Sequence, residues 1–372
     1  MMVSKMALST PAIHVPSGQM LYVVPVHDTI EWKKLADGSD DGAFEFAFDA
    51  EKCILDLRQT SQEQQGQQRH PIPQLQPYFE VWLVMYHIFT RHSDAHVVCL
   101  HFPGVRKLDI RQRALILAFV QGGDTDAAHM FCSRSVFFQV SLPPSGTYKG
   151  WLGTHVIESP YNDIHLSEHS QYPLRPSKPL GGTLVYSRYI PSLDKTFTMR
   201  ALNIESDADA FAEWMNNDRV AKFWNMKGDK DKVHVPYLNA LDVDKHVVNV
   251  IGSLDDEQFL YTELYYVAED HLAPFADSAG LYDRGFHLLV GNERLRGPHI
   301  VRAWLTSIVH CLFLHDRRTR YVFLEPRADN EKLIGYLLLH GFTKLKEFDF
   351  PHKRAALMRI ERETFFKVGP AM

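Results

Sequence analysis

Residues 282–324 read YDRGFHLLVGNERLRGPHIVRAWLTSIVHCLFLHDRRTRYVFL, and this stretch decides the fold. The short apolar run at 286–291 is stopped by glycine and predicts a strand in the middle of a sheet. The following apolar positions recur at i, i+3 and i+4, which predicts an amphipathic helix packed on that sheet. They are Val301, Trp304, Leu305, Ile308, Val309, Leu312 and Phe313. The run Tyr321–Leu324 predicts the next strand.

A charged loop containing glycine joins the strand to the helix. Pro298 fits the first helical turn, where a missing N–H costs nothing. The backbone N–H groups of Arg296, Gly297 and their neighbours then point into the loop at the positive end of the helix dipole, which predicts a phosphate-binding site. The loop matches neither Gly-x4-Gly-Lys-Ser/Thr nor Gly-x-Gly-x-x-Gly, so neither a nucleotide triphosphatase nor a dinucleotide fold is indicated.

The loop Arg294-Leu-Arg-Gly297-Pro-His299 resembles the Gln/Arg-x-x-Gly-x-Gly/Ala pyrophosphate loop of the GNAT acyltransferases, with His299 where a small residue is usual. Residues at the spacing of the second GNAT signature follow it downstream. They are Asn330, Tyr336 and the pair Gly341-Phe342. This resemblance implies an α/β (α+β) fold with a mixed, mostly antiparallel sheet whose central strands splay apart.

Four longer runs are more specific: RGFHLLVG, RGPHIVRAW, LEPRADN and EFDFPHKRAALM. They resemble the siderophore hydroxamate acyltransferases, which acylate N-hydroxylated lysine or ornithine side chains in aerobactin, mycobactin and fungal hydroxamate pathways. The resemblance extends from about residue 196 to about residue 366 and does not reach the preceding sequence.

The length of 372 residues predicts two domains, and the content of 45% hydrophobic and 23% charged residues is typical of a globular protein. A formal net charge of -5 gives no reason to expect nucleic acid or an anionic membrane as partner. The four cysteines lie in apolar runs without a Cys-x-x-Cys pair, which predicts buried thiols and no disulfide framework. With neither a signal peptide nor a long apolar span in view, we expect a cytoplasmic protein.

The first half repeats the order of the opening stretch in pattern only. Strands are expected at 20–26, 44–48, 53–57 and 96–102, with a helix at 78–90 before the last of them. Its loop at 59–68 is glutamine-rich and contains only Gly66. We therefore expect residues 1–150 to be a degenerate GNAT-like copy in tandem with the catalytic domain, and an unrelated α+β domain remains the alternative.

Residues 151–192 are rich in proline and glycine and are expected to connect the halves, with the catalytic domain at 193–372. His165, Glu168 and His169 stand on this segment without the helix and third ligand of a zinc site, so no metal site is expected. The catalytic domain is expected to open with a strand at 196–202 and a helix from Ala208 that Ser206 or Asp207 could cap.

The resemblance implies acyl-CoA as a cosubstrate, with no permanently bound cofactor. The pyrophosphate would lie on the residues from Arg294 to His299, in particular Arg294, Arg296, Gly297 and His299, and Asn330 is assigned to the same ligand. The thioester carbonyl would lie near the backbone N–H groups of Leu289 and Val290, which could stabilise the developing oxyanion.

The resemblance also implies a His and Asp pair, and His287 and Asp329 match its positions. His287 would accept the proton released as the substrate nitrogen attacks, and Asp329 would orient it. The residues alone leave open a buried histidine satisfied by a carbonyl and an aspartate that caps a helix. Tyr336 occupies the place of the tyrosine that often protonates the departing thiolate in GNAT enzymes, with a core tyrosine as the alternative.

A zwitterionic amino acid needs partners for its ammonium and carboxylate groups. Glu263, Asp283 and Arg284 supply such charges, and Trp224, Tyr265 and His246 could wall the alkyl chain, although each of these six could equally be an ordinary packing or surface residue.

Three functions remain open: an acyltransferase of N5-hydroxyornithine, one of N6-hydroxylysine or an aminoglycoside-like amine, and a non-catalytic acyl-CoA-binding protein. The first is adopted because the two-domain length resembles the fungal members of the family. The expected partners are therefore small molecules, and a homodimer is left open.

Overall fold

The computed structural model describes residues 12–14, 20–25, 33–36, 44–52, 54–59, 77–92, 94–102, 129–140, 151, 172–173 and 175–368. The chain divides into two compact units, with the division between Gly150 and Trp151. The predicted loop at 59–68, apart from Gln59, lies outside the described residues, as do His165, Glu168 and His169. Most of the predicted connection at 151–192 is outside them as well.

The first unit contains a seven-stranded sheet in the order β1-β2-β3-β4-β5-β6-β7. Its elements are β1 (Ala12–His14), β2 (Met20–Pro25), β3 (Lys33–Ala36), β4 (Phe44–Asp49), β5 (Ile54–Gln59), α1 (Pro77–Arg91), β6 (Val97–His101), β7 (His129–Ser133) and α3 (Arg134–Phe137). All pairs are antiparallel except β5 and β6, which are parallel and have α1 between them in sequence. That the unit is a degenerate copy of the second stays a prediction.

The second unit contains an eight-stranded sheet in the order β14-β15-β13-β12-β11-β10-β9-β8. Its strands are β8 (Leu184–Ile190), β9 (Lys195–Ala201), β10 (Val247–Leu254), β11 (Glu257–Tyr266), β12 (Arg284–Val290), β13 (Tyr321–Leu324), β14 (Thr343–Phe350) and β15 (Lys353–Glu361). Its helices are α4 (Ile204–Asn216), α5 (Asp218–Trp224), α6 (Val235–Val243), α7 (Pro298–His315), α8 (Glu331–Leu339) and α9 (Arg362–Val368). Strand β8 falls inside the segment that the sequence marked as a connection, and it pairs with β9 in this sheet.

The central strand β12 has two different edges. Along β11 it is paired over its whole length, from Tyr266 opposite Arg284 to Leu260 opposite Val290. Along β13 the pairing is parallel and is limited to Arg284 and Gly285. Beyond Gly285 the two strands therefore separate, which is the splay that the GNAT resemblance implied.

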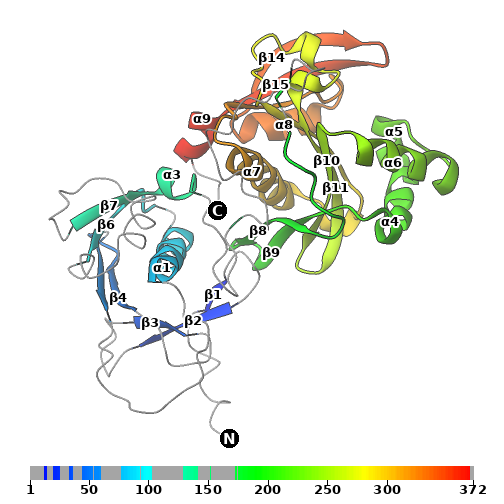
Figure 1. Cartoon of the computed structure of the whole chain (residues 1–372). Helices are drawn as coiled ribbons and strands as arrows, with labels where there is room; N and C mark the ends of the chain where they lie inside the picture. The colour runs from blue at the N-terminus through cyan, green and yellow to red at the C-terminus, as the bar shows by residue number, and fades with distance from the viewer. Residues whose placement is uncertain are drawn as a thin grey trace, which may run out of the picture. The chain divides into compact units, whose positions relative to one another are not determined.

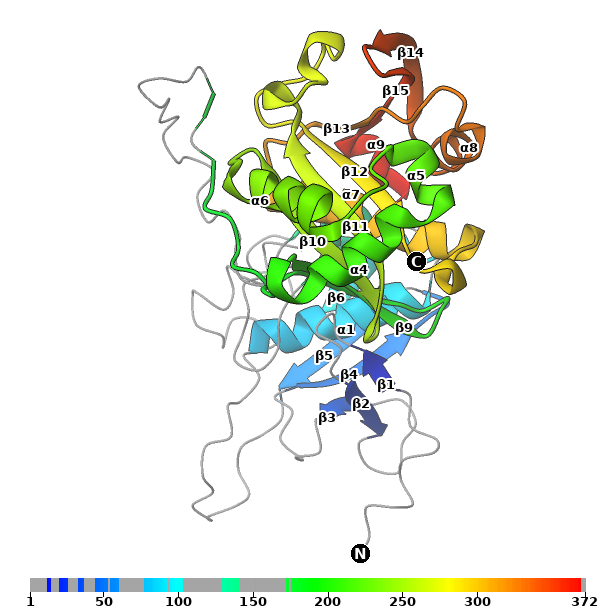
Figure 2. The ribbon, with the colours of Figure 1, turned by 90° about the vertical axis from the view of Figure 1, so that its right-hand side faces the viewer.

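Helices cover both faces of this sheet. Figures 1 and 2 show α7 on one face and α4, α5 and α6 on the other. The apolar stripe predicted for α7 is buried on the sheet: Trp304, Leu305, Ile308 and Leu312 are each at most 2% exposed. On the opposite face, Phe211, Met215 and Leu238 pack with Tyr261 and Leu289. The sheet is thus buried on both sides, as expected for an α/β layer arrangement.

The helix α4 begins earlier than predicted and has another cap. Asn203 is the capping residue, and its side chain accepts a hydrogen bond from the backbone N–H of Glu205. Asp207 is instead bound by both Nη atoms of Arg200, each at 2.7 Å. The Ser206 or Asp207 cap was therefore wrong, because Arg200, near the end of β9, pairs with the aspartate.

Two glycines let bulky aromatic side chains lie flat against β12. A Cβ atom on Gly285 would lie 2.3 Å from Cζ of Tyr265, and one on Gly291 would lie 2.1 Å from the ring of Trp214. Neither position has room for a methyl group. Both contacts bring aromatic rings onto the face of the sheet that carries His287, because residues two apart in a strand share a face.

We expect Gly291→Ala to lower the free energy of unfolding by about 1–3 kcal/mol, because the added methyl group overlaps the Trp214 ring. Gly335→Ala is the matched control. Gly335 lies in α8, and among the described residues no neighbouring atom is within 4 Å of the place where its methyl group would lie. This change should therefore leave stability unchanged or raise it by up to about 1 kcal/mol. Urea unfolding of both variants checks the difference, and equal effects would contradict the packing described.

Candidate active site

His287 lies between two carboxylates. On β12 it stands directly opposite Glu263 of β11, and residues so opposed in an antiparallel pair project on the same face. Its Nδ1 is 2.9 Å from Oε2 of Glu263. Its Nε2 is 2.8 Å from Oε1 of Glu325, the residue that follows β13. Both carboxylates are 4% exposed and the imidazole is 31% exposed, so the ring is the accessible member of the group.

The remaining oxygens of the two carboxylates are also bonded. The hydroxyls of Tyr237 and Tyr261 donate to Oε1 of Glu263 at 2.6 and 2.9 Å. The hydroxyl of Tyr265 donates to Oε2 of Glu325 at 2.8 Å, and its ring centroid is 4.6 Å from that of His287. Lys353 donates to the backbone oxygen of Glu325 at 2.9 Å and to its Oε1 at 3.3 Å. We call His287, Glu263, Glu325, Tyr237, Tyr261, Tyr265 and Lys353 the imidazole cluster.

The cluster favours a protonated imidazole. Burial alone would lower the pKa of His287, but the charge of Glu325 and the hydrogen bonds to Glu263 and Glu325 outweigh it and raise the pKa well above 6.5. Burial alone would likewise raise the pKa of Glu325. The charge and hydrogen bond of His287, together with Lys353, lower it below 4.5 instead. Both shifts favour the charged forms of His287 and Glu325.

The structure does not bring Asp329 to His287. Its carboxylate accepts hydrogen bonds from Arg327 at 3.0 and 2.9 Å, and its side chain is 58% exposed. Both ring nitrogens of His287 are occupied by Glu263 and Glu325. The prediction that Asp329 orients the imidazole is therefore wrong, and two glutamates hold the ring in its place.

The separated edge of β12 offers backbone groups to a ligand. Gly291 N–H donates to Phe259 of β11, and the register is regular from there to Arg284. Because backbone N–H groups alternate in direction along a strand, that of Leu289 also faces β11. Those of Leu288 and Val290 face the side where β13 has separated. Of the two predicted oxyanion donors, Val290 is directed to this open edge and Leu289 is not.

The predicted phosphate loop lies at the exposed start of α7. Gly297 precedes the helix with φ 144°, a conformation that favours glycine, and Pro298 is the first helical residue. The N–H groups of the first turn have no acceptor within the helix. Arg294, Arg296 and His299 are exposed around this turn, and Arg294 donates to Glu257 at 2.6 Å. The arrangement suits an anion, and pyrophosphate binding at this loop stays a prediction.

The amino-acid sequence of this chain is similar to the sequences of known acyltransferases. The Acetyltransferase (GNAT) domain family matches residues 203–350. The chain is 45% identical over 238 residues to the putative lysine N-acyltransferase C17G9.06c of Schizosaccharomyces pombe, covering 64% of this chain and 68% of that protein. It is 35% identical over 317 residues to the hydroxyornithine transacylase SID3 of Ajellomyces capsulatus, covering 78% and 72%. The chain belongs to the siderophore hydroxamate acyltransferase family.

This acyltransferase is also 37% identical over 234 residues to the N(6)-hydroxylysine O-acetyltransferase of Escherichia coli, covering 63% of this chain and 70% of that one. It is therefore an enzyme, with acyl-CoA as cosubstrate, and the non-catalytic alternative is set aside. Within the described parts of the chain, no helix has the length and hydropathy needed to cross a bilayer. Among the same residues, no group of His, Cys, Asp or Glu side chains is arranged to hold a metal ion.

The predicted substrate residues of the acyltransferase divide into two groups. Glu263 and Tyr265 belong to the imidazole cluster, and the ring of Trp224 lies 6.1 Å from that of Tyr261. His246 is bound instead by Asp244 at 2.5 Å and lies 3.7 Å from Asp270. Burial alone would lower its pKa, but these two carboxylates raise it.

Asp283 and Arg284 are occupied within the fold. Asp283 accepts hydrogen bonds from the backbone N–H groups of Arg320, Tyr321 and Gly280, each at 2.8 Å. Arg284 donates to the backbone oxygen of Tyr265 at 3.0 Å and lies 3.9 Å from the ring of Tyr266. The structure therefore does not bring these two predicted residues to the imidazole cluster.

The two residues predicted on the second GNAT signature lie at α8. Asn330 caps this helix, and its side chain accepts a hydrogen bond from the N–H of Leu333. Tyr336 is half-buried in the same helix. The capping role of Asn330 accounts for its position without acyl-CoA, and the acid role of Tyr336 stays a prediction.

Sequence reasoning missed four members of the cluster: Glu325, Lys353, Tyr237 and Tyr261. A signal for Glu325 was present, because a carboxylate directly after the wholly buried strand Tyr321–Leu324 is unusual unless it is paired. No local signal marked Tyr237 or Tyr261, which look like core aromatics in the sequence.

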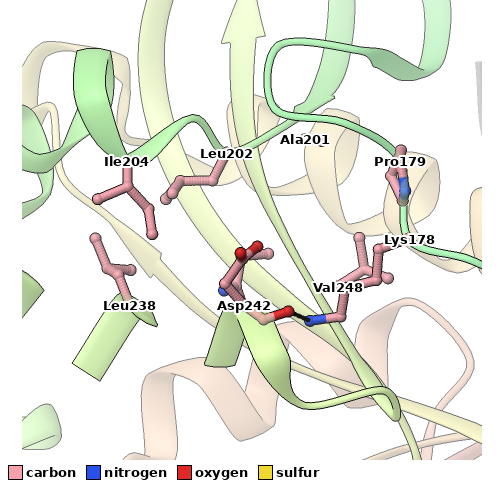
Figure 3. A pocket seen from close by; sticks show the side chains of 9 residues that line it. Lys178, Pro179, Ala201, Leu202, Ile204, Leu238, Asp242 and Val248 are labelled. Atoms are coloured by element: carbon pink, nitrogen blue, oxygen red, sulfur yellow. Dashed lines mark hydrogen bonds between the residues drawn. The ribbon is translucent and has the colours of Figure 1, made fainter. Parts of the chain in front are cut away.

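A small pocket lies apart from the imidazole cluster. Figure 3 shows it between the segment at Lys178, the start of α4 and the end of α6. Its volume of about 20 Å³ has room for about one water molecule, so it does not suit a substrate. It is lined by Lys178, Pro179, Ala201, Leu202, Ile204, Leu238, Asp242, Val248 and Asn249.

The cluster predicts a pH dependence of stability. The raised pKa of His287 stabilises the fold fully below 6.5, and this contribution is lost as pH rises through the folded value. The lowered pKa of Glu325 stabilises the fold above 4.5, and this contribution is lost as pH falls. Stability from the pair should therefore be greatest between about 4.5 and 6.5.

Above pH 6.5 we expect the free energy of unfolding of the wild type to fall by at most about 1.4 kcal/mol per pH unit from this one proton. Glu325→Gln should shorten the pH range of that fall, because it removes the charge that holds the proton. Urea unfolding at several pH values from 6 to 9 checks this. An identical pH dependence in both proteins would contradict the described electrostatics.

Proposed function

We propose that this enzyme transfers the acyl group of an acyl-CoA to the hydroxylamine nitrogen of N5-hydroxy-L-ornithine, forming a hydroxamate for siderophore biosynthesis. The observation that carries the choice of acceptor is the similarity to the hydroxyornithine transacylase SID3, which extends over 78% of this chain. N6-hydroxylysine is the second candidate. It is favoured by the similarity to the N(6)-hydroxylysine O-acetyltransferase, which covers a smaller share of the chain.

The open edge of β12 and the start of α7 are the proposed acyl-CoA site. The pantetheine amides would bond to the strand edge that β13 leaves unpaired beyond Gly285, as an added strand does at an exposed sheet edge; at Val290 the backbone oxygen already accepts a hydrogen bond from Arg219 at 2.7 Å. The pyrophosphate would lie at the first turn of α7 with Arg294 and Arg296 beside it. The loop from Gly291 to Gly297 joins the strand to the helix, so the two parts of the proposed site are neighbours in the chain.

The proposed acceptor site is on the face of the sheet covered by α4, α5 and α6. Trp224 and Tyr261 contact each other there, and Tyr261 also donates to Glu263 beside His287. Trp224 is partly exposed and suits the alkyl part of an amino acid side chain, whereas Tyr261 is fully buried and belongs to the imidazole cluster. The reacting nitrogen would therefore approach the partly exposed imidazole of His287.

The electron-withdrawing oxygen makes a hydroxylamine less basic than an alkylamine, so its nitrogen is largely unprotonated at neutral pH. It can attack the thioester carbonyl directly, and the N–H of Val290 would donate to the resulting oxyanion. The reaction then needs one proton to leave the nitrogen and one to reach the thiolate. His287, which is 31% exposed, is more accessible than either carboxylate and can exchange protons.

Purified enzyme incubated with N5-hydroxyornithine and a panel of acyl-CoAs should form a hydroxamate, measured by its coloured ferric complex. N6-hydroxylysine should react more slowly by kcat/KM, and unmodified ornithine, tested by release of free CoA thiol, much more slowly than either. Faster reaction of N6-hydroxylysine would reverse the order of the two candidates. Absence of product with every pair would remove both.

Arg294→Ala should raise the KM for acyl-CoA about tenfold and change kcat little, because the lost contact is to a part of the ligand that does not react. Arg317→Ala is the matched control, since Arg317 is an exposed arginine that follows the far end of α7. Steady-state kinetics with varied acyl-CoA distinguish the two. A similar KM for both variants would place the pyrophosphate elsewhere.

A further inference from the structure

Both nitrogens of His287 face carboxylate oxygens, at 2.9 and 2.8 Å. An ionised carboxylate only accepts hydrogen bonds, so both contacts are hydrogen bonds only when each ring nitrogen carries a proton. A neutral imidazole has one such proton and would leave a lone pair facing a carboxylate. The geometry therefore describes an imidazolium, a form that cannot accept a proton.

The other groups around the ring are consistent with this charge. Glu325 has Lys353 as a second cationic partner, so the two carboxylates face one imidazolium and one ammonium, and the four formal charges sum to zero. Three tyrosine hydroxyls from α6 and β11, those of Tyr237, Tyr261 and Tyr265, complete the shell. Asp270 contributes a more distant negative charge, felt at Tyr237 and Tyr265.

The proposed acyl transfer does not need a base before bond formation, because the hydroxylamine nitrogen is already unprotonated at neutral pH. It does need a proton for the sulfur that leaves. We propose that His287, in place of Tyr336, acts as the acid toward the departing thiolate, that it enters the reaction as an imidazolium, and that Glu325 is the positioning residue that keeps it charged. This inference rests on the acyl transfer proposed above.

The protons balance in this order. Attack forms the N–C bond and moves the carbonyl π electrons to oxygen, and collapse restores the carbonyl and breaks the C–S bond. One ring N–H of His287 leaves its carboxylate partner and gives its proton to the sulfur, while the other nitrogen keeps its carboxylate partner. The neutral ring then takes the proton from the new, positively charged nitrogen. The products are the hydroxamate and the CoA thiol, and the ring ends as the imidazolium that it was at the start.

The pH profile of kcat/KM tests this order. For the wild type, the alkaline limb should lie well above pH 6.5, where the imidazolium loses its proton. Glu325→Gln should move that limb down by about one pH unit or more, because an opposite charge beside the ring is removed. It should also lower kcat at pH 8 about tenfold. Glu263→Gln should move the limb in the same direction, which keeps the test available if one variant does not fold.

Glu213→Gln is the control, because it removes the same charge from an exposed position on α4. Its alkaline limb should coincide with that of the wild type. An acidic limb from protonation of the free hydroxylamine should be shared by all variants. The proposal is overturned if the limb that Glu325→Gln moves is one on which activity rises with pH, since His287 would then act from its neutral form.

An NMR titration of His287 without substrate separates this inference from the proposed function. The wild-type ring should remain protonated through pH 7.5, with the His287 signal assigned by its loss in His287→Gln. The Glu325→Gln ring should lose its proton at lower pH. A wild-type ring that is neutral at pH 7 overturns the inference whatever the substrate is. A protonated ring with no product from any hydroxylamine leaves the cluster standing and removes the proposed reaction.

Discussion

An imidazolium between two buried carboxylates constrains the whole second unit. Ionised groups taken out of water are costly unless their hydrogen-bonding capacity is filled. Every carboxylate oxygen of Glu263 and Glu325 accepts at least one hydrogen bond. The donors come from α6, β11, β12 and β15, so these elements must lie in one arrangement for the cluster to be satisfied. A shift of any of them would remove at least one hydrogen bond from a buried carboxylate.

The separation of β12 from β13 lies next to His287, where the imidazole of the cluster is partly exposed. Two bonded residues, Arg284 and Gly285, hold the strands together at one end, and His287 lies just past them. There the imidazole is 31% exposed while its carboxylate partners are almost fully buried. The same strand leads through the loop at 291–297 to the start of α7, so the proposed thioester and phosphate sites lie on consecutive segments of the chain. Protein groups that meet opposite ends of one ligand are therefore positioned by a single strand and helix.

Local patterns were sufficient for the secondary structure of this region. The strand expected at 286–291 forms at Arg284–Val290, the helix begins at Pro298 and the strand Tyr321–Leu324 is as predicted. Local patterns did not identify the carboxylate partners of His287. Glu325 is 38 residues from His287 and was passed over for Asp329, which is four residues further along the chain. Sequence spacing cannot distinguish two carboxylates that follow the same strand. Which of them reaches the His287 ring depends on where β13 ends alongside β12.

The sequence by itself determined the family, the order of strands and helices around the loop at Gly297, and His287 as the residue of interest. These follow from local periodicity and from motifs that are contiguous in the chain. Only the tertiary structure decided that Glu263 and Glu325 hold the ring, that Val290 and not Leu289 faces the open edge, and that Asp283 and Arg284 serve the fold. Each of these depends on the register between strands that are distant in sequence. That register is set by packing and hydrogen bonding across the sheet, for which a single strand carries no information.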